Sequence, residues 1–163
     1  MRGFVAGAVL AMLLTLTSTP VVGQGFVFGA GVGPTFSLED GGGTDFHVMG
    51  TFRFGEEEGK PVSFRADGML QFADGDDLFS GTLNAMYHFT TSGSRLRPYV
   101  IGGGGIYANG GTDFGINAGA GLTMPLGNSP ARLFGEARFH AIFAEDTINQ
   151  LPLTIGILFT AGD

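Results

Sequence analysis

The sequence predicts an all-β protein, an eight-stranded antiparallel up-and-down transmembrane β-barrel preceded by a cleavable signal peptide. From residue 25 onward, apolar side chains recur at every second position, which is the period of an extended strand. The alternating segments have about the length, ~9–11 residues, that a tilted strand needs to cross a bilayer. Short breaks separate them, so consecutive strands should pair antiparallel, and eight of them can close without an exposed edge.

The first 23 residues have the three-part layout of a secretory signal peptide. Arg2 gives a short positive start, residues 4–17 form an apolar run, and small residues precede Gln24. A membrane-spanning helix needs ~20 apolar residues, which is more than this run offers. We therefore place cleavage after Gly23 (residues 1–23 removed) and assign residues 24–163 to a single barrel domain.

The first four strands are expected at residues 25–37, 45–54, 62–72 and 79–89. In each of them one face carries mainly Phe, Val, Leu, Tyr and Ala. The other face carries mainly Gly, Ser, Thr, Asn and Met, with an occasional Arg, Asp or His. The breaks between these strands are rich in Gly, Asp and Glu, which favours turns over continued strand.

Three further strands are expected at residues 97–108, 114–124 and 151–159. Residues 102–105 are all glycine, which leaves the facing of the first of these strands open. The sequence Asn109-Gly110-Gly111 after it is a strong tight-turn signal. Apolar residues occupy every second position of the other two strands.

The clearest strand is residues 131–143. Its odd positions hold no polar side chain, whereas its even positions include Arg132, Glu136, Arg138 and His140. Such a two-sided segment fits a strand with one face in each of two environments.

The polar face should point into the barrel and the apolar face toward lipid. The polar face consists mostly of small residues, which suit a narrow interior. A water-facing exterior would carry many Lys and Glu, yet the chain has only Lys60. The charged and imidazole side chains of the polar face are Arg53, Arg65, Asp67, Glu136, Arg138, His47, His88 and His140.

These inward groups are expected to form a polar network held by salt bridges. Unpaired ions in a desolvated interior are unfavourable, and the arginines nearly balance the carboxylates. The histidines lie on separate strands without metal-ligand spacing, so interior hydrogen bonding is favoured over a metal site. Ser63 and Ser80 share their face, but no motif joins a nucleophile to a base and an acid. No catalytic residue, cofactor or metal is predicted.

Two motifs resemble those of small outer-membrane β-barrels of the OmpA/OmpX type. Arg97-Pro98-Tyr99-Val100 with the glycine run after it is similar to a strand motif of that family. The alternating end at Phe159 is similar to the C-terminal aromatic signal read by the barrel-assembly machinery, although residues 160–163 follow it. The resemblance covers residues 25–159 and implies export through the periplasm to the bacterial outer membrane. It assigns no activity, because the family includes lipid A deacylases and acyltransferases.

The charge pattern predicts an acidic outer rim. The net charge of −7, which becomes more negative when Arg2 is removed, argues against a nucleic-acid partner. With both termini in the periplasm, the outer breaks hold carboxylates and no basic residue: Glu39, Asp40, Asp45, Asp74, Asp76, Asp77, Asp113, Glu145 and Asp146. Asp74, Asp76 and Asp77 share one turn and are weak candidates for a divalent cation shared with lipopolysaccharide, set against simple solvation.

We expect a non-catalytic barrel with a structural or envelope-interaction role. Its expected partners are outer-membrane lipid, lipopolysaccharide and the barrel-assembly machinery, and it should be a monomer. A narrow porin-like channel for small solutes is the main alternative, and a lipid-modifying enzyme is the other. An eight-stranded barrel is just wide enough for its side chains to fill, so a large diffusion pore is not expected.

Overall fold

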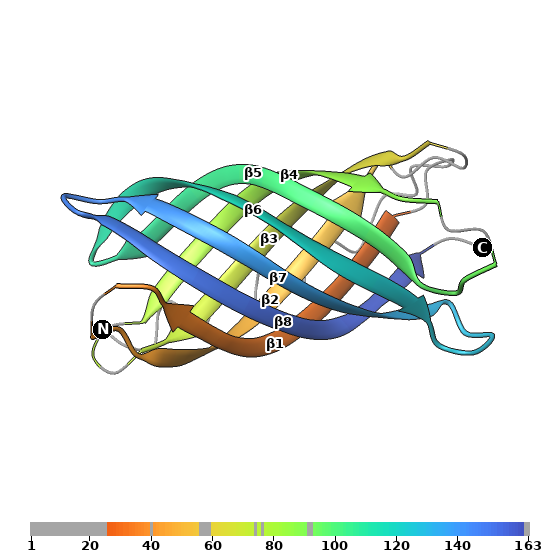
Figure 1. Cartoon of the computed structure of the whole chain (residues 1–163), viewed down its shortest axis with the longest axis horizontal. Coiled ribbons are helices and arrows are strands. Elements are labelled where there is room, and N and C mark those ends of the chain that lie inside the picture. Colours follow the sequence, from red (N-terminus) through yellow and green to blue (C-terminus); the bar gives the residue numbers. More distant parts are fainter. Residues whose placement is uncertain are drawn as a thin grey trace.

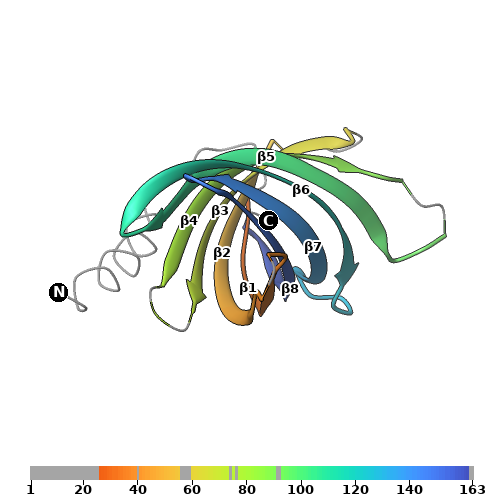
Figure 2. The ribbon, with the colours of Figure 1, turned by 60° about the vertical axis from the view of Figure 1, so that its left-hand side comes forward.

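The strands close into one barrel (Figures 1 and 2). The computed structural model describes residues 26–39, 41–55, 60–73, 75, 77–90 and 93–161. Strands adjacent in sequence pair antiparallel and β8 pairs with β1, which confirms the predicted fold class. The strands are β1 Phe26–Ser37, β2 Thr44–Phe54, β3 Val62–Phe72, β4 Leu78–His88, β5 Arg97–Asn109, β6 Gly111–Pro125, β7 Ala131–Phe143 and β8 Thr147–Ala161. The expected signal peptide, with its cleavage after Gly23, lies outside the described residues.

β1 begins and β8 ends at the same end of the barrel, here called the terminal end; the other end is the distal end. The stagger of the barrel can be followed through the paired residues of neighbouring strands. Starting at Val27 on β1 and moving once around through β2 to β8, the pairing returns to β1 at Ser37, ten residues from the start. This stagger tilts the strands steeply against the axis and gives a lumen that side chains can fill. Within the described ranges, no helix is long and apolar enough to span a membrane.

Two predicted strands begin at least three residues too late, and the other predicted boundaries are within two residues of those observed. The last strand was expected at residues 151–159, but β8 runs Thr147–Ala161 and its first residue pairs with Phe143. The sixth strand was expected from residue 114, but β6 starts at Gly111, opposite Asn109. In both hairpins the backbone stays paired up to the turn, where polar side chains interrupt the apolar alternation. Asp113, expected in a break, consequently lies within β6, and Asp45, counted with the outer carboxylates, is the second residue of β2.

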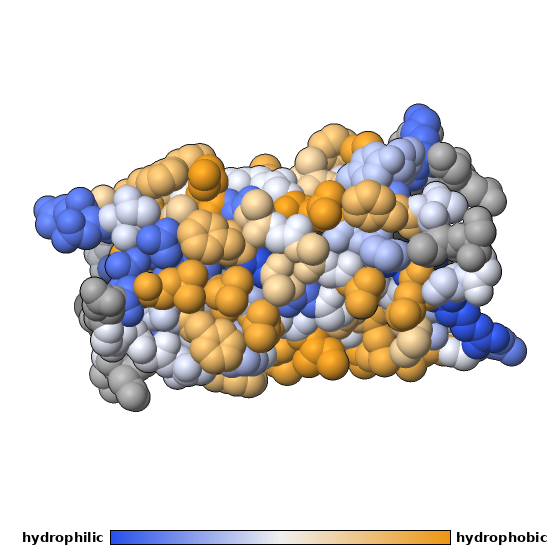
Figure 3. All heavy atoms as spheres, in the orientation of Figure 1, coloured by the Kyte–Doolittle hydropathy of each residue, from blue (hydrophilic) through white to orange (hydrophobic). Residues whose placement is uncertain are grey.

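The apolar face points outward, as predicted. Leu83 is 66% exposed and Ile155 63%, whereas Arg65 is only 1% exposed. In β5, whose facing the sequence left open, Tyr99 and Tyr107 are buried in the interior. Figure 3 shows hydrophobic side chains over the length of the wall and hydrophilic ones gathered toward the two ends. An apolar exterior of this extent is the property of a barrel wall that meets lipid.

Aromatic side chains gather on the outside near both ends. Phe28 stacks on Phe159 near the terminal end, and Phe114 stacks on Phe143 near the distal end. On β3, Phe64 lies near the terminal end and Phe72 near the distal end, and both side chains are exposed. They are ~26 Å apart along the strand at ~3.3 Å per residue, or ~20 Å along the axis for a tilt of ~40°. Such paired girdles are typical of the two membrane interfaces.

Several inward glycines make room for large interior side chains. A Cβ at Gly121 would overlap the ring of Tyr99, and one at Gly115 would lie 2.6 Å from the ring of Tyr107. A Cβ at Gly156 would lie 2.5 Å from the ring of Phe134. The high glycine content therefore serves the filling of the lumen as well as close strand packing.

Candidate functional site

Four charged side chains form a closed ring in the lumen. Arg65 Nε lies 3.0 Å from Asp67 Oδ1, and Arg65 NH2 lies 2.7 Å from Glu136 Oε1. Arg138 NH1 lies 2.9 Å from Asp67 Oδ2, and Arg138 Nε lies 2.8 Å from Glu136 Oε1. The first two residues are on β3 and the other two on β7, which are four places apart in either direction around the barrel. The ring therefore reaches from one wall to the opposite wall.

Two neutral side chains add hydrogen bonds to the ring. The Tyr99 hydroxyl donates to Glu136 Oε2 at 2.7 Å, and Asn84 Nδ2 donates to Asp67 Oδ2 at 3.0 Å. The four charged side chains of the ring are each at most 3% exposed. Charges this deeply buried depend on their partners, and removing one partner of such a set typically costs ~3–5 kcal/mol. The ring thus links opposite walls of the barrel and also blocks the lumen at its centre.

Arg53, also assigned to the interior from the sequence, is buried on β2. It stands directly opposite Arg65 in the β2–β3 ladder. The ring itself contains two arginines and two carboxylates, so it is electrically balanced without Arg53.

The histidines occupy three separate places instead of joining the ring. His47 shares hydrogen bonds with Thr35 Oγ1 through Nδ1 and with Thr154 Oγ1 through Nε2, both at 2.9 Å. His140 Nδ1 lies 2.9 Å from the Tyr107 hydroxyl. The third, His88, shares a hydrogen bond with a serine. The arrangement within the described chain is a set of small polar groups around one charged centre.

His88 Nε2 lies 2.9 Å from Ser63 Oγ, which is the spacing of a nucleophile and its general base. Ser63 is 1% exposed and faces the interior, so its hydroxyl is closed to a substrate in this structure. Ser80, the other serine considered from the sequence, is also buried. The Ser63–His88 contact is therefore explained as a hydrogen bond between two polar side chains of the barrel interior.

Apolar side chains pack inside the barrel on both sides of the ring. Phe134 and Leu158 meet Val27 near the terminal end, in a cluster that continues past the ring to Met49 and Met69. Near the distal end the buried cluster is Leu78, Tyr107 and Ile142. The centre of the lumen is therefore charged, and apolar clusters lie toward each end.

The distal rim is only partly described. Asp77, Glu145 and Asp146 are exposed there, while Asp74 and Asp76 lie outside the described residues. Asp45 accepts a hydrogen bond from Gln71 Nε2 at 2.8 Å instead of standing free in a loop. In the part of the chain that the structure describes, no group of three or more His, Asp or Glu is placed to hold a metal ion. The divalent-cation candidate formed by Asp74, Asp76 and Asp77 stays a prediction.

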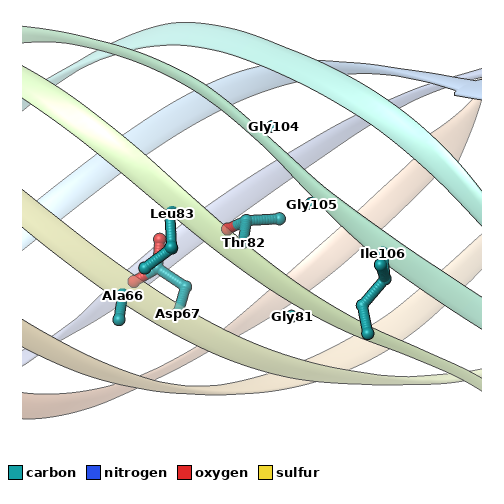
Figure 4. A pocket seen from close by; sticks show the side chains of 8 residues that line it. All are labelled: Ala66, Asp67, Gly81, Thr82, Leu83, Gly104, Gly105 and Ile106. Carbon is teal, nitrogen blue, oxygen red and sulfur yellow. The ribbon is translucent and has the colours of Figure 1, made fainter.

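The outer wall has a shallow recess of about 390 Å³ at β3, β4 and β5 (Figure 4). Leu83 and Ile106 stand beside it, and Gly81 and Gly104 contribute to its lining. Asp67, which belongs to the ring, and Thr82 also contribute to its lining.

Sequence reasoning did not identify Tyr99 and Tyr107 as interior hydrogen-bonding groups. The glycine run between them hid the alternation of β5. The Arg-Pro-Tyr motif could have signalled Tyr99, since a buried tyrosine hydroxyl usually finds a partner. Nothing in the sequence signals that His47 meets Thr154, which is 107 residues away.

No model of a protein family matches the sequence, and no curated protein matches it by sequence. Solved structures do match. Neisserial surface protein A superposes with a TM-score of 0.69 at 17% identity, over 82% of this chain and 96% of that chain. The fold is that of a small outer-membrane β-barrel. This confirms, for the architecture, the resemblance to barrels of the OmpA/OmpX type.

Two further structures extend this comparison. The N-terminal β-barrel domain of Pseudomonas aeruginosa OprF gives a TM-score of 0.56 at 21% identity, covering 83% of this chain and 100% of that chain. The outer membrane enzyme PagL gives 0.54 at 14% identity, covering 82% and 98%. One fold thus carries an enzyme as well as a surface protein, so activity must be argued from the interior and the rims.

Proposed function

We propose that the chain is a non-catalytic barrel of the bacterial outer membrane with a structural or envelope-interaction role. The observation that carries the proposal is the Arg65–Asp67–Glu136–Arg138 ring, which joins opposite walls of the lumen. Together with the apolar clusters near both ends, it supports a filled interior over a solute path. Binding and recognition are then left to the lipid-facing wall and the loops at the rims.

The outer membrane is supported by the shape and chemistry of the exterior. The aromatic girdles enclose an apolar wall, and the fold is shared with outer-membrane barrels. In this orientation the terminal end faces the periplasm and the distal rim faces outward. The proposed partners are the surrounding lipid, lipopolysaccharide and, during insertion, the barrel-assembly machinery, and the proposed state is a monomer.

Planar-bilayer recording of the refolded protein separates this function from the narrow channel. With the ring intact, we expect no discrete current steps. The Glu136→Ala variant opens a gap in the ring and serves as the positive control for detecting conduction. Regular, ion-selective steps from the unmodified protein would favour the channel instead.

A fluorophosphonate probe tests the absence of serine-hydrolase catalysis. The Ser63–His88 pair is the described nucleophile–base pair most suited to such chemistry, but its hydroxyl is buried. We expect no labelling of the folded barrel in lipid. Labelling that disappears in Ser63→Ala would show an activated serine and contradict the proposal.

A further inference from the structure

The backbone ladder is interrupted at the seam that closes the barrel. Between β1 and β8 the register runs to Val32 opposite Ile155 and resumes at Thr35 opposite Pro152. Gly33 and Pro34 therefore form no ladder pair with Leu153 and Thr154. Proline has no N–H to donate, so Pro34 accounts for the interruption on this side.

The other side of β8 is interrupted next to the same place. Between β7 and β8 the register runs to Ala137 opposite Leu153 and resumes at His140 opposite Gln150. Arg138 and Phe139 thus form no ladder pair with the stretch that holds Pro152. Prolines in sheets are normally confined to edge strands and bulges, but a closed barrel has no edge. Each residue of 151–154 is consequently paired with one neighbouring strand only: Leu151 and Pro152 with β1, and Leu153 and Thr154 with β7. We call residues 151–154 the weakly held stretch of β8.

Side-chain hydrogen bonds span the interrupted seam from inside. His47, on β2, meets Thr35 of β1 and Thr154 of β8, both at 2.9 Å. Its imidazole is fully buried. His47 therefore ties β1 to β8 where the backbone does not, and it acts as a latch over the seam.

Unpartnered polar groups lie just inside this seam. Asn117, His140 and Gln150 face one another in register on β6, β7 and β8. Asn117 Oδ1 and Nδ2, His140 Nε2 and Gln150 Oε1 are buried and have no hydrogen-bond partner. The three side chains are 5%, 1% and 8% exposed. Buried groups of this kind require a partner, and this row, with no charged side chain, offers both a donor and acceptors.

Access to the row from the ends of the lumen is restricted. Leu78, Tyr107 and Ile142 pack together on its distal side, and the ion-pair ring lies on the other side. The weakly held stretch of β8 is the wall element adjacent to the row, because Gln150 immediately precedes it in the chain.

We propose that the middle of β8 is a lateral portal, latched by His47, through which the uncharged hydrogen-bonding head of a membrane-dissolved amphiphile reaches the row Asn117, His140 and Gln150. The apolar part of such a molecule would remain among the lipids outside Leu151 and Leu153. The portal rests on the lipid-embedded orientation but not on the absence of catalysis or conduction.

Single-cysteine labelling tests the portal, since the chain has no cysteine of its own. Gln150→Cys in lipid vesicles is treated with a bilayer-soluble pyrene maleimide or with a water-soluble, membrane-impermeant methanethiosulfonate. We expect the maleimide to label it roughly tenfold faster than the matched interior variant Ser80→Cys on β4, because Ser80 is buried and local opening exposes only the seam. Adding His47→Phe should increase the rate, and adding Pro34→Val with Pro152→Val should reduce it.

Equal maleimide rates for the two cysteines would overturn the portal. So would labelling of Gln150→Cys by the water-soluble reagent alone, which would place the entrance at a barrel end. Amide hydrogen exchange of the unmodified protein provides a check that needs no variant. The amides of Leu151, Leu153 and Thr154 should exchange faster than those of the uninterrupted β3–β4 ladder around Gly68 and Gly81, and equal protection would also overturn the proposal.

Discussion

Arg65 NH2 on β3 and Glu136 Oε1 on β7 lie 2.7 Å apart although their strands are on opposite sides of the barrel. The contact is possible because two long side chains reach toward each other from facing walls. Asp67 and Arg138 double the link, so the walls are joined by two arginines and two carboxylates. Pairing the charges in this way makes the centre of a narrow barrel rigid and closes the lumen to solutes.

The ring predicts a large stability loss for Glu136→Gln. The substitution preserves the size of the side chain but leaves Asp67 as the one carboxylate facing Arg65 and Arg138, so one positive charge of the ring is uncompensated in a buried site. We expect a loss of ~3–5 kcal/mol in the free energy of unfolding, measured with urea in lipid vesicles. Replacing all four ring residues by apolar residues of similar volume should cost much less, because no charge is then left unpaired. A loss below ~1 kcal/mol for Glu136→Gln would instead mean that water solvates the ring.

The lipid-facing wall predicts a depth-dependent penalty for charge. Ala137 is exposed in the middle of β7, on the same face as Ala131 near the terminal end. Ala137→Arg should destabilise the barrel in bilayers by ~2–4 kcal/mol, and Ala131→Arg by ~0–1 kcal/mol. The same unfolding assay measures both. Equal tolerance of the two substitutions would contradict a bilayer around the wall.

The sequence predicts the faces of this barrel far better than its contacts. Alternation along residues 131–143 is a local property, so it indicates which side of β7 meets lipid before any partner is known. The same rule places the charged residues of β2 and β3 inside. It fails on β5, because glycine has no side chain with which to mark a face.

The interior contacts depend on closure and stagger, which no local pattern encodes. Arg65 and Glu136 are 71 residues apart in sequence, and the ring forms only when β3 and β7 face each other at matching height. The expected single network therefore becomes a ring with the histidines apart from it. His47 shows the point most clearly, since its partners belong to the first and last strands.

Phe159 is predicted to act mainly in assembly. Its ring stacks on Phe28 with centroids 5.8 Å apart, so Phe28→Ala removes the same stacking without altering the C-terminal signal. We expect Phe159→Ala to reduce insertion in cells several-fold more than Phe28→Ala, as quantified by the folded fraction in isolated outer membranes. Both variants should lose similar stability, ~0.5–1.5 kcal/mol beyond area burial, once refolded in detergent. Indistinguishable insertion of the two variants would assign Phe159 a packing role alone.

The distal rim leads to a prediction about lipopolysaccharide. Asp77, Glu145 and Asp146 are exposed at this end, and the sequence adds Asp74 and Asp76 to the β3–β4 turn. Such a field repels anions but attracts divalent cations, which prefer oxygen ligands and can also bind lipid phosphates.

Replacing Asp74, Asp76 and Asp77 with Asn should therefore weaken co-purification with lipopolysaccharide, and only when millimolar Mg²⁺ or Ca²⁺ is present. The matched control replaces Glu56, Glu57 and Glu58 with Gln, which removes three carboxylates from the β2–β3 connection at the opposite end. That control should leave the association unchanged, because in the proposed orientation its rim faces the periplasm. A chelator should reduce association of the unmodified protein to the level of the Asn variant. If neither the chelator nor the substitutions alter it, the carboxylates solvate the rim and hold no cation that lipopolysaccharide shares.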